Sequence, residues 1–265
     1  MHYGFIGAGN ITSAIVTGVL RSGMVKPVQI SVFDIDEAVL SAFAAKHGIH
    51  AAADAAALVQ HSDIVLLAVK PNVCAQVLSP LQDVLAAQKV PLVSLAAGHT
   101  LQTLALFAGN IPIIRVMPNV NAAVCGSVNA LCANTFVTAA QKESVTAFFN
   151  HTGATMDIEE KLFSAFSAIA GCSPAFTYLY INALAQGAHK NGMNKKQALQ
   201  IAAQAVLGSA AALLESENEH PWALIDKVCS PGGTTIEGVC TLQDNRFESA
   251  VVQAVDSAVQ KDQKM

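Results

Sequence analysis

Charged side chains are scarce in this chain. Asp, Glu, Lys and Arg make up 13% of its 265 residues, 52% are apolar, and the net charge is −4 without any basic cluster. The lack of a basic cluster argues against nucleic acid and anionic membranes as partners. So apolar a chain must bury much of its surface in a core, which excludes a disordered protein. Because few charges remain to cover an exterior, the composition also indicates a large interface between subunits.

Long uninterrupted apolar runs are missing too. The longest apolar stretches, near residues 162–185 and 198–214, are broken by Ser, Asn, Gln, Gly or Pro, so neither is expected to span a membrane. A glycine-rich loop begins at Gly7, which leaves no room before it for a signal peptide. The sequence therefore predicts a cytoplasmic protein.

Paired cysteines, clustered histidines and hydrolase or kinase signatures are also absent. The six cysteines show no CxxC spacing, which favours buried free thiols over a disulfide framework or a metal site. The eight histidines show no metal-ligand pattern such as HxxxH, so no metal is expected. His99 is singled out only because it follows Gly98. Without a GxSxG or Walker motif, neither a hydrolase nor a kinase is supported.

What is present is a strand–glycine loop–helix pattern over Tyr3–Thr12, YGFIGAGNIT. Gly7 permits a tight turn, Gly9 leaves room for a pyrophosphate, and the helix start offers free N–H groups. Thr12 replaces the third small residue of the fingerprint and is expected to push helix and strand slightly apart. The alternative is an ordinary strand-to-helix turn. The pattern predicts these cofactor-binding residues: Gly7, Ala8, Gly9, Asn10 and Ile11.

Strands and helices then alternate as far as about residue 157. Strands are predicted at 28–33, 63–69, 91–95 and 112–116, with helices at 37–46, 54–60, 73–85 and 100–107. Such alternation is typical of a doubly wound parallel sheet with right-handed crossovers. Ligands bind such sheets at the carboxyl ends of the strands. The loops predicted to share that rim are 7–10, 34–36, 70–72, 96–98 and 117–119.

After residue 157 the pattern becomes helical. Ser173 is predicted as the N-cap and Pro174 as the first residue of a long helix, and Asn194 as the cap of a second. Further helices are expected at 221–228, 235–242 and 247–259. We therefore predict a dinucleotide-binding domain over 1–157 and an α-helical domain over 158–265. Small residues on the second long helix favour close helix packing across a dimer interface, and packing within a monomeric core is the alternative. These small residues are Ala198, Ala202, Ala205, Gly208 and Ala212.

Three further positions suggest ligand contacts. Asp34 ends the second strand and favours NADH by binding ribose hydroxyls, unless Asp34 or Asp36 merely caps the next helix. Asn119, after Pro118, is placed to reach the nicotinamide or substrate, or else holds its own loop as an Asx-turn. Residues 230–235, SPGGTT, precede a helix and suit a carboxylate, with a plain capped helix start as the alternative.

Together these segments resemble the pyrroline-5-carboxylate reductase family over nearly the full length. The resemblance rests on GFIGAGN (4–10), SDIVLLAVKP (62–71), AAG (96–98), RVMPN (115–119), HP (220–221) and PGGTT (231–235). It implies a Rossmann domain joined to an α-helical domain that interlocks two subunits, and NADP(H) or NAD(H) as the cofactor. It also implies that further residues line the cofactor, namely Ala68, Val69, Lys70, Pro71, Ala96, Ala97 and Gly98, with Asn119 near the nicotinamide.

The resemblance implies hydride transfer to the C=N carbon of a cyclic imino acid, giving proline. The substrate loop would comprise Gly232, Gly233, Thr234 and Thr235, with Thr235 as the hydroxyl on the ring nitrogen. One segment departs from the family: where SGSGPAY is usual, residues 170–176 read AGCSPAF. A hydroxyacid dehydrogenase is disfavoured, because Lys190 lies too late in its helix to match GxxxKxxxN. A cofactor-binding sensor without turnover is the second rival.

Overall fold

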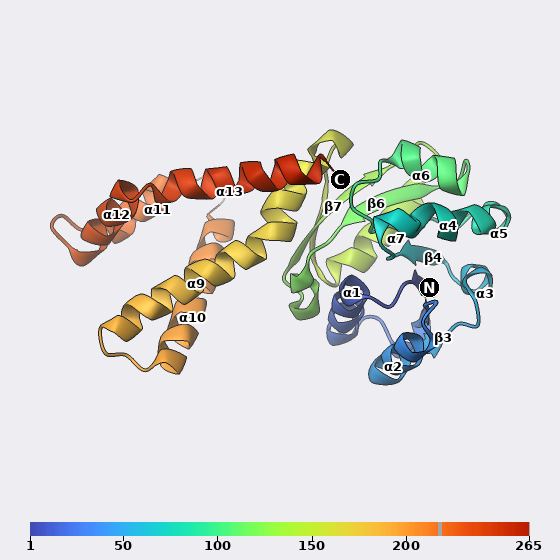
Figure 1. Cartoon of the computed structure of the whole chain (residues 1–265), viewed down its shortest axis with the longest axis horizontal. Coiled ribbons are helices and arrows are strands. Elements are labelled where there is room, and N and C mark those ends of the chain that lie inside the picture. The colour runs from blue at the N-terminus through green and yellow to red at the C-terminus, as the bar shows by residue number, and fades with distance from the viewer. Residues whose placement is uncertain (217–218, 265) are drawn as a thin grey trace. The chain divides into compact units, whose positions relative to one another are not determined.

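The computed structural model describes residues 1–216 and 219–264. The chain forms two compact units. The first comprises residues 1–171 together with 259–265, and the second comprises residues 172–258. The last strand ends at Asp157, so the first unit extends beyond the predicted domain boundary into the following helical segment. Figure 1 shows the elements coloured along the chain.

The first unit is built on an eight-stranded sheet in the order β3-β2-β1-β4-β5-β6-β7-β8. Neighbouring strands are parallel except β6 and β7, which are antiparallel. The order of the first six strands is that of a dinucleotide-binding doubly wound sheet. The strands are β1 (Tyr3–Ile6), β2 (Ile30–Phe33), β3 (His50–Ala51), β4 (Ile64–Leu67), β5 (Leu92–Ser94), β6 (Ile113–Met117), β7 (Ser127–Ala133) and β8 (Gly153–Asp157).

Helices cover both faces of this sheet. One buried cluster includes Phe5, Ile15 and Phe148, and the other includes Leu58, Leu67 and Leu104. Because both faces are buried, the central strands read as continuous apolar runs. The α-helices of this unit are α1 (Asn10–Arg21), α2 (Glu37–His47), α3 (Ala55–Gln60), α4 (Cys74–Leu78), α5 (Gln82–Gln88), α6 (Leu101–Ala108), α7 (Ala139–Asn150) and α8 (Phe163–Phe166).

The single helix predicted over 73–85 is wrong. A 3₁₀ turn at Ser79–Leu81 separates α4 from α5. Pro80 lies in this turn, and because proline has no N–H group it removes one helical hydrogen bond. Side-chain caps mark the starts of α3 and α6. Asp54 accepts a hydrogen bond from the first turn of α3, and Thr100 accepts one from the first turn of α6.

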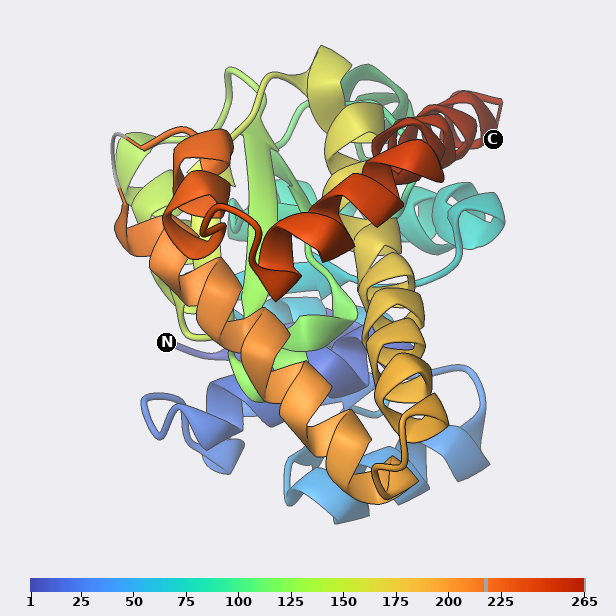
Figure 2. The same cartoon turned by 90° about the vertical axis from the view of Figure 1, so that its left-hand side faces the viewer.

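The second unit is entirely helical in its described residues. Its helices are α9 (Ser173–Lys190), α10 (Lys195–Glu215), α11 (Pro221–Val228), α12 (Thr234–Asp244) and α13 (Phe247–Asp262), the last of which ends in the first unit. The α9 and α10 helices lie side by side near the turn that joins them (Figure 2). Asn194 caps α10 as predicted, with its side chain accepting from the backbone N–H groups of Lys196 and Gln197.

The predicted start of the long helix at an N-cap Ser173 is wrong. Residues Ser167–Cys172 form a π-helical segment that continues directly into α9, and Cys172 already has helical backbone angles. Pro174 does lie in the first turn of α9, as predicted. The continuous helical stretch that contains α9 therefore begins N-terminal to Ser173, with a 3₁₀ turn at Glu160–Leu162.

The stripe of small residues on α10 divides into two parts. Ala198 and Ala202 are buried against α9 with Ala185, whereas Ala205, Gly208 and Ala212 are exposed. Two helical stretches, Glu160–Lys190 and Lys195–Glu215, are long and apolar enough to cross a membrane by length and composition alone. An exposed apolar surface on a helix also fits a contact with another subunit.

Candidate active site

The glycine loop between β1 and α1 has the geometry of a phosphate site. Gly7 has φ +109°, and a Cβ there would lie 2.7 Å from the Ala68 carbonyl oxygen, so this position requires glycine. Gly9 is the N-cap of α1, no side chain caps this helix start, and a Cβ on Gly9 would meet nothing within 4 Å. The start of α1 therefore has no side-chain cap and leaves room for close approach at Gly9, which fits a pyrophosphate.

Thr12 is the residue that departs from the glycine fingerprint. Its side chain is fully buried, and Oγ1 donates a hydrogen bond of 2.7 Å to the Gly7 carbonyl oxygen. The hydroxyl thus ties the first turn of α1 to the glycine loop. A buried hydroxyl without such a partner would cost free energy, so this bond makes threonine acceptable at a position that otherwise suits a small residue.

Asp34, at the end of β2, holds the glycine loop. Its Oδ2 accepts from the Ala8 N–H at 2.8 Å, and its Oδ1 accepts from the Asp36 N–H at 3.0 Å. The cap of α2 is Asp36, whose side chain accepts from the Ala38 and Val39 N–H groups. The residue that caps α2 is therefore Asp36, and Asp34 is not the cap. Asp34 borders a cavity of about 280 Å³ whose other lining is mostly apolar, including Phe33, Val69 and Val77.

The loops that follow β4 and β5 lie at the same rim. The Ala68 N–H donates to the Ile6 carbonyl at 2.8 Å, and the Leu95 N–H donates to the Leu67 carbonyl at 2.9 Å. His99 Nε2 lies 2.8 Å from the Pro71 carbonyl oxygen, and its ring packs edge-on against Phe107. His99 thus joins the 70–72 loop to the 96–98 loop. Parallel pairing from β1 to β6 brings all five predicted loops to one edge, as expected.

Asn119 uses both ends of its side-chain amide within the chain. Oδ1 accepts from the Asn121 N–H at 3.0 Å, and Nδ2 donates to the Ala170 carbonyl at 2.8 Å. The residue is only 6% exposed. The Asx-turn that the sequence left open is therefore present, and a second bond reaches across 51 positions of sequence to the π-helical segment.

The PGGTT segment lies in the second unit and forms a tight turn. The Gly233 N–H donates to the Ser230 carbonyl at 3.0 Å, and Gly232 has φ +66°. Gly233 is the N-cap of α12 and carries no side-chain cap, while Thr234 and Thr235 are exposed at the first turn. The plain side-chain cap considered for this helix start is absent, and its first N–H groups and two hydroxyls are available to a ligand.

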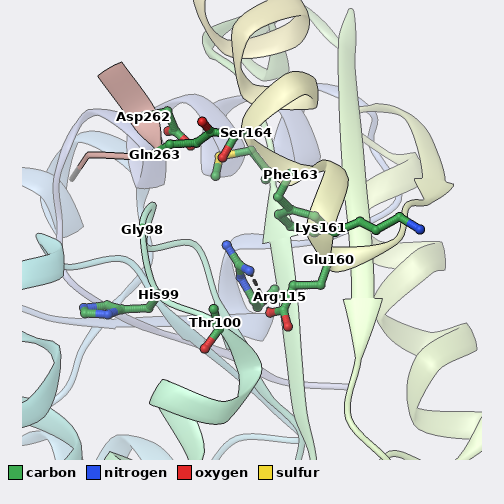
Figure 3. Close-up of a pocket in the computed structure, with 11 residues that line it drawn as sticks. Gly98, His99, Thr100, Arg115, Glu160, Lys161, Phe163, Ser164, Asp262 and Gln263 are labelled. Atoms are coloured by element: carbon green, nitrogen blue, oxygen red, sulfur yellow. Dashed lines mark hydrogen bonds and ion pairs between the residues drawn. The ribbon is translucent and has the colours of Figure 1, made fainter. Parts of the chain in front are cut away.

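Arg115 is a site residue to which the sequence assigned no separate role. Its side chain is 7% exposed, and its guanidinium donates from Nη1 to Glu160 Oε1 at 2.7 Å and lies 4.5 Å from the centre of the Phe163 ring. It borders a cavity of about 470 Å³ that is also lined by Gly98, Met117 and Glu160 (Figure 3). The sequence could have indicated this role, because Arg115 is a lone arginine inside an otherwise apolar strand and a buried charge needs a partner.

No group of three or more His, Cys, Asp or Glu side chains suited to a metal ion occurs among residues 1–216 and 219–264. The six cysteines are free thiols, as predicted, but only Cys74 is fully buried and Cys240 is exposed. Burial raises the pKa of the Cys74 thiol to about 11. For Cys132 burial is the main cause of a pKa raised to about 11. Neither thiol is therefore activated as a nucleophile.

Comparison with known proteins identifies the family. Pyrroline-5-carboxylate reductase of Escherichia coli is 40% identical over 263 residues, which cover 99% of this chain and 97% of that protein. The chain belongs to the pyrroline-5-carboxylate reductase family. A family model for pyrroline-5-carboxylate reductase dimerisation matches residues 160–265, and one described as NADP oxidoreductase coenzyme F420-dependent matches residues 2–98.

Solved structures agree with this membership. The 1-pyrroline-5-carboxylate reductase of Streptococcus pyogenes is 36% identical, with a TM-score of 0.88 and coverage of 100% of this chain and 99% of that one. The Plasmodium falciparum pyrroline carboxylate reductase, solved with NADP bound, is 27% identical, with a TM-score of 0.87 and coverage of 100% and 97%. The predicted fold class and the predicted NAD(P)-dependent reductase are confirmed.

Membership in the pyrroline-5-carboxylate reductase family also bears on assembly. The dimerisation model covers the helical region where exposed apolar side chains are concentrated, among them Leu207 and Leu214 on α10. This match supports homo-oligomerisation. The departure at residues 170–176 from the family pattern falls at the end of the π-helical segment and the start of α9.

Proposed function

We propose that this chain reduces 1-pyrroline-5-carboxylate to L-proline with NADPH or NADH, as the last step of proline biosynthesis. The observation that supports it most is the uncapped, open start of α1 behind Gly9, which suits a dinucleotide pyrophosphate. When bound, the reduced nicotinamide supplies the hydride that the imine carbon accepts. The carbon of a C=N bond is already electrophilic and becomes more so as its nitrogen gains a proton, so positioning can supply most of the catalysis.

The first unit, within residues 1–157, would hold the cofactor. The Gly7–Ile11 loop would bind the pyrophosphate, and Asp34 would lie beside the adenosine ribose. The apolar cavity next to Asp34 has room for a planar base. Asn119 would lie near the nicotinamide. The rest of the cofactor would be lined by loop residues at the rim, namely Ala68, Val69, Lys70, Pro71, Ala96, Ala97 and Gly98.

The helical region, within residues 158–265, would bind the substrate. The turn at Gly232 and Gly233 leaves the first N–H groups of α12 free to bind a carboxylate. The exposed Thr234 and Thr235 hydroxyls at this helix start can each donate a hydrogen bond. We assign the Thr235 hydroxyl to the ring nitrogen, to which it would pass a proton, taking another from water, as hydride transfer turns the C=N bond into a C–N bond. Thr234 would assist at the same loop, and we also assign Asn119 to the substrate.

The active assembly would be at least a homodimer formed through the helical region, located in the cytoplasm, with no role for nucleic acid or membrane. The support is the exposed apolar surface of α10 within the region matched by the dimerisation model. A second copy covering this surface would remove it from water, which is favourable in proportion to the apolar area buried.

The direct test is reduction of 1-pyrroline-5-carboxylate by the purified protein with reduced nicotinamide carrying deuterium at C4. We expect saturable oxidation of the cofactor and one deuterium in the proline ring, detected by mass spectrometry. Omission of the imine is the control for background oxidation. Cofactor binding without any proline formation would contradict the proposal and favour a sensor.

A further inference from the structure

The helical segment Glu160–Cys172 is attached to the end of β6 at two points. Near its start, Glu160 Oε1 accepts from Arg115 Nη1 at 2.7 Å. Near its end, the Ala170 carbonyl accepts from Asn119 Nδ2 at 2.8 Å. Arg115 and Asn119 belong to the one short motif RVMPN, and both are nearly fully buried. A single strand end thus holds both ends of the segment.

The first attachment joins three elements through one carboxylate oxygen. Glu160 Oε1 also accepts from the Leu101 N–H at 2.6 Å, at the first turn of α6 just after the 96–98 loop. The Arg115 guanidinium packs on the Phe163 ring one turn further along the segment. Figure 3 shows Arg115 and Glu160 facing each other at the cavity that Gly98 and Thr100 border. Removing the Glu160 carboxylate would leave the nearly buried Arg115 side chain without its charge partner.

The second attachment is made to irregular backbone. Ala170 lies in the π-helical segment Ser167–Cys172, and such segments are commonly found at functional sites. Asn119 is held in orientation by the bond from the Asn121 N–H to its Oδ1, so its NH₂ group is directed at one carbonyl. Between the two attachments, Phe163, Phe166 and Ala170 form a small buried cluster with Ala130 of β7.

We propose that Arg115 and Asn119 are positioning residues for imine reduction. They fix the segment 160–172 against the strand end that also carries the 117–119 loop, and they thereby set the wall of the cavity beside Gly98 and Met117. This inference rests on the proposed reductase function and assigns the motif a role beyond contact with the nicotinamide.

The test variant for the second attachment is Asn119→Ser. Serine can still accept from the Asn121 N–H as a cap but is too short to reach the Ala170 carbonyl, and it introduces no charge. We expect faster amide hydrogen exchange in residues 160–172, a kcat lowered by about tenfold, and a dissociation constant for NADPH within about twofold of the original, because misplacement costs rate more than cofactor affinity. The matched control is Asn150→Ser at the exposed end of α7, which should change none of these.

The first attachment is tested by Arg115→Met and by Arg115→Lys, which keeps the charge opposite Glu160. Methionine should lower kcat and raise exchange over the same residues, and lysine should restore part of both. If Arg115→Met does not fold, Asn119→Ser decides the matter alone.

The proposal is overturned if exchange in residues 160–172 is unchanged in Asn119→Ser, or if its NADPH affinity falls as much as its kcat, since the latter would make Asn119 a direct cofactor ligand. Absence of turnover in the unmodified protein would instead refute the proposed function. The hydrogen-exchange comparison would still decide whether the two attachments hold the segment.

Discussion

At the scale of single residues, the Asp34 carboxylate at the end of β2 is held against the glycine loop. The carboxylate is fixed by two backbone N–H groups, from Ala8 and Asp36, so it cannot easily turn away. A fixed anion at this place favours ribose hydroxyls and repels a 2′-phosphate. The chain has no Lys or Arg between Gln29 and Ala45 to offset it.

Asp34→Asn should therefore shift the cofactor preference toward NADPH. Asparagine retains an oxygen for one of the two N–H groups but removes the charge, and relief of one like-charge contact is expected to raise the ratio of kcat/KM for NADPH over NADH by about tenfold. Steady-state kinetics with both cofactors measures the ratio. Asp36→Asn, which keeps a good cap on α2, is the control and should leave the ratio nearly unchanged. A ratio unmoved by Asp34→Asn would mean that this carboxylate serves only the glycine loop.

Single residues were predictable where one side chain or one backbone angle decides the outcome. Gly7 and Asn194 act as their local sequence implied, because a positive φ and a helix cap are local requirements. The partner of Asn119 was not predictable, because Ala170 lies 51 positions away and offers only its backbone carbonyl. The Arg115–Glu160 pair spans 45 positions and was missed for the same reason.

At the scale of elements, α1 packs closely against the 3₁₀ turn that follows Asn119. Gly18 lies inside α1, and a Cβ there would come within 2.0 Å of the Ala122 carbonyl oxygen in the 3₁₀ turn Val120–Val124. Cys125 also directs its Sγ at the Gly18 carbonyl, at 3.5 Å. Glycine at this position thus permits an approach that no other residue would allow.

Gly18→Ala should lower the free energy of unfolding by about 1–3 kcal/mol, the usual cost of overpacking. Thermal or urea unfolding followed by circular dichroism measures it. The matched control is Gly187→Ala in α9, where a Cβ meets nothing within 4 Å and alanine should stabilise the helix by about 0.5–1 kcal/mol. Equal effects of the two substitutions would contradict the packing argument.

Elements were predictable where apolar runs were continuous and were missed where polar residues interrupt them. The β7 strand carries Asn129, which is fully buried because its amide donates to the Phe149 and Ala154 carbonyls and to two threonine hydroxyls. The β8 strand, GATMD, carries only the short apolar pair Ala154 and Met156, and none of its residues is buried. Both strands depend on partners distant in sequence, and neither was predicted.

At the scale of the whole molecule, a subunit interface would account for the low charge. Leu207 and Leu214 on α10 are 63% and 83% exposed in a single chain. They lie in the region matched by the dimerisation model. The same helix passes the length and composition test for a membrane span, but a second subunit explains its exposed apolar residues without a bilayer.

Leu207→Glu should therefore weaken self-association, because burying an unpaired carboxylate in an apolar interface is costly. Sedimentation velocity should show the unmodified protein as a dimer or larger and Leu207→Glu shifted toward monomer. The control is Val28→Glu, which is 77% exposed and lies outside the matched region; it should leave the assembly unchanged. A Leu207→Glu protein that sediments like the unmodified one would place the interface elsewhere.

In the proposed division of labour, the glycine loop and its rim would hold the cofactor and the PGGTT loop would bind the substrate. Comparing turnover with cofactor affinity in Thr235→Val tests it most directly, with Thr241→Val on the same helix as the matched control. We predict a kcat lowered at least about 100-fold, the lower range for loss of a positioned proton donor, with the dissociation constant for NADPH unchanged. Unchanged turnover in Thr235→Val, or loss of cofactor affinity in proportion to turnover, would contradict the account.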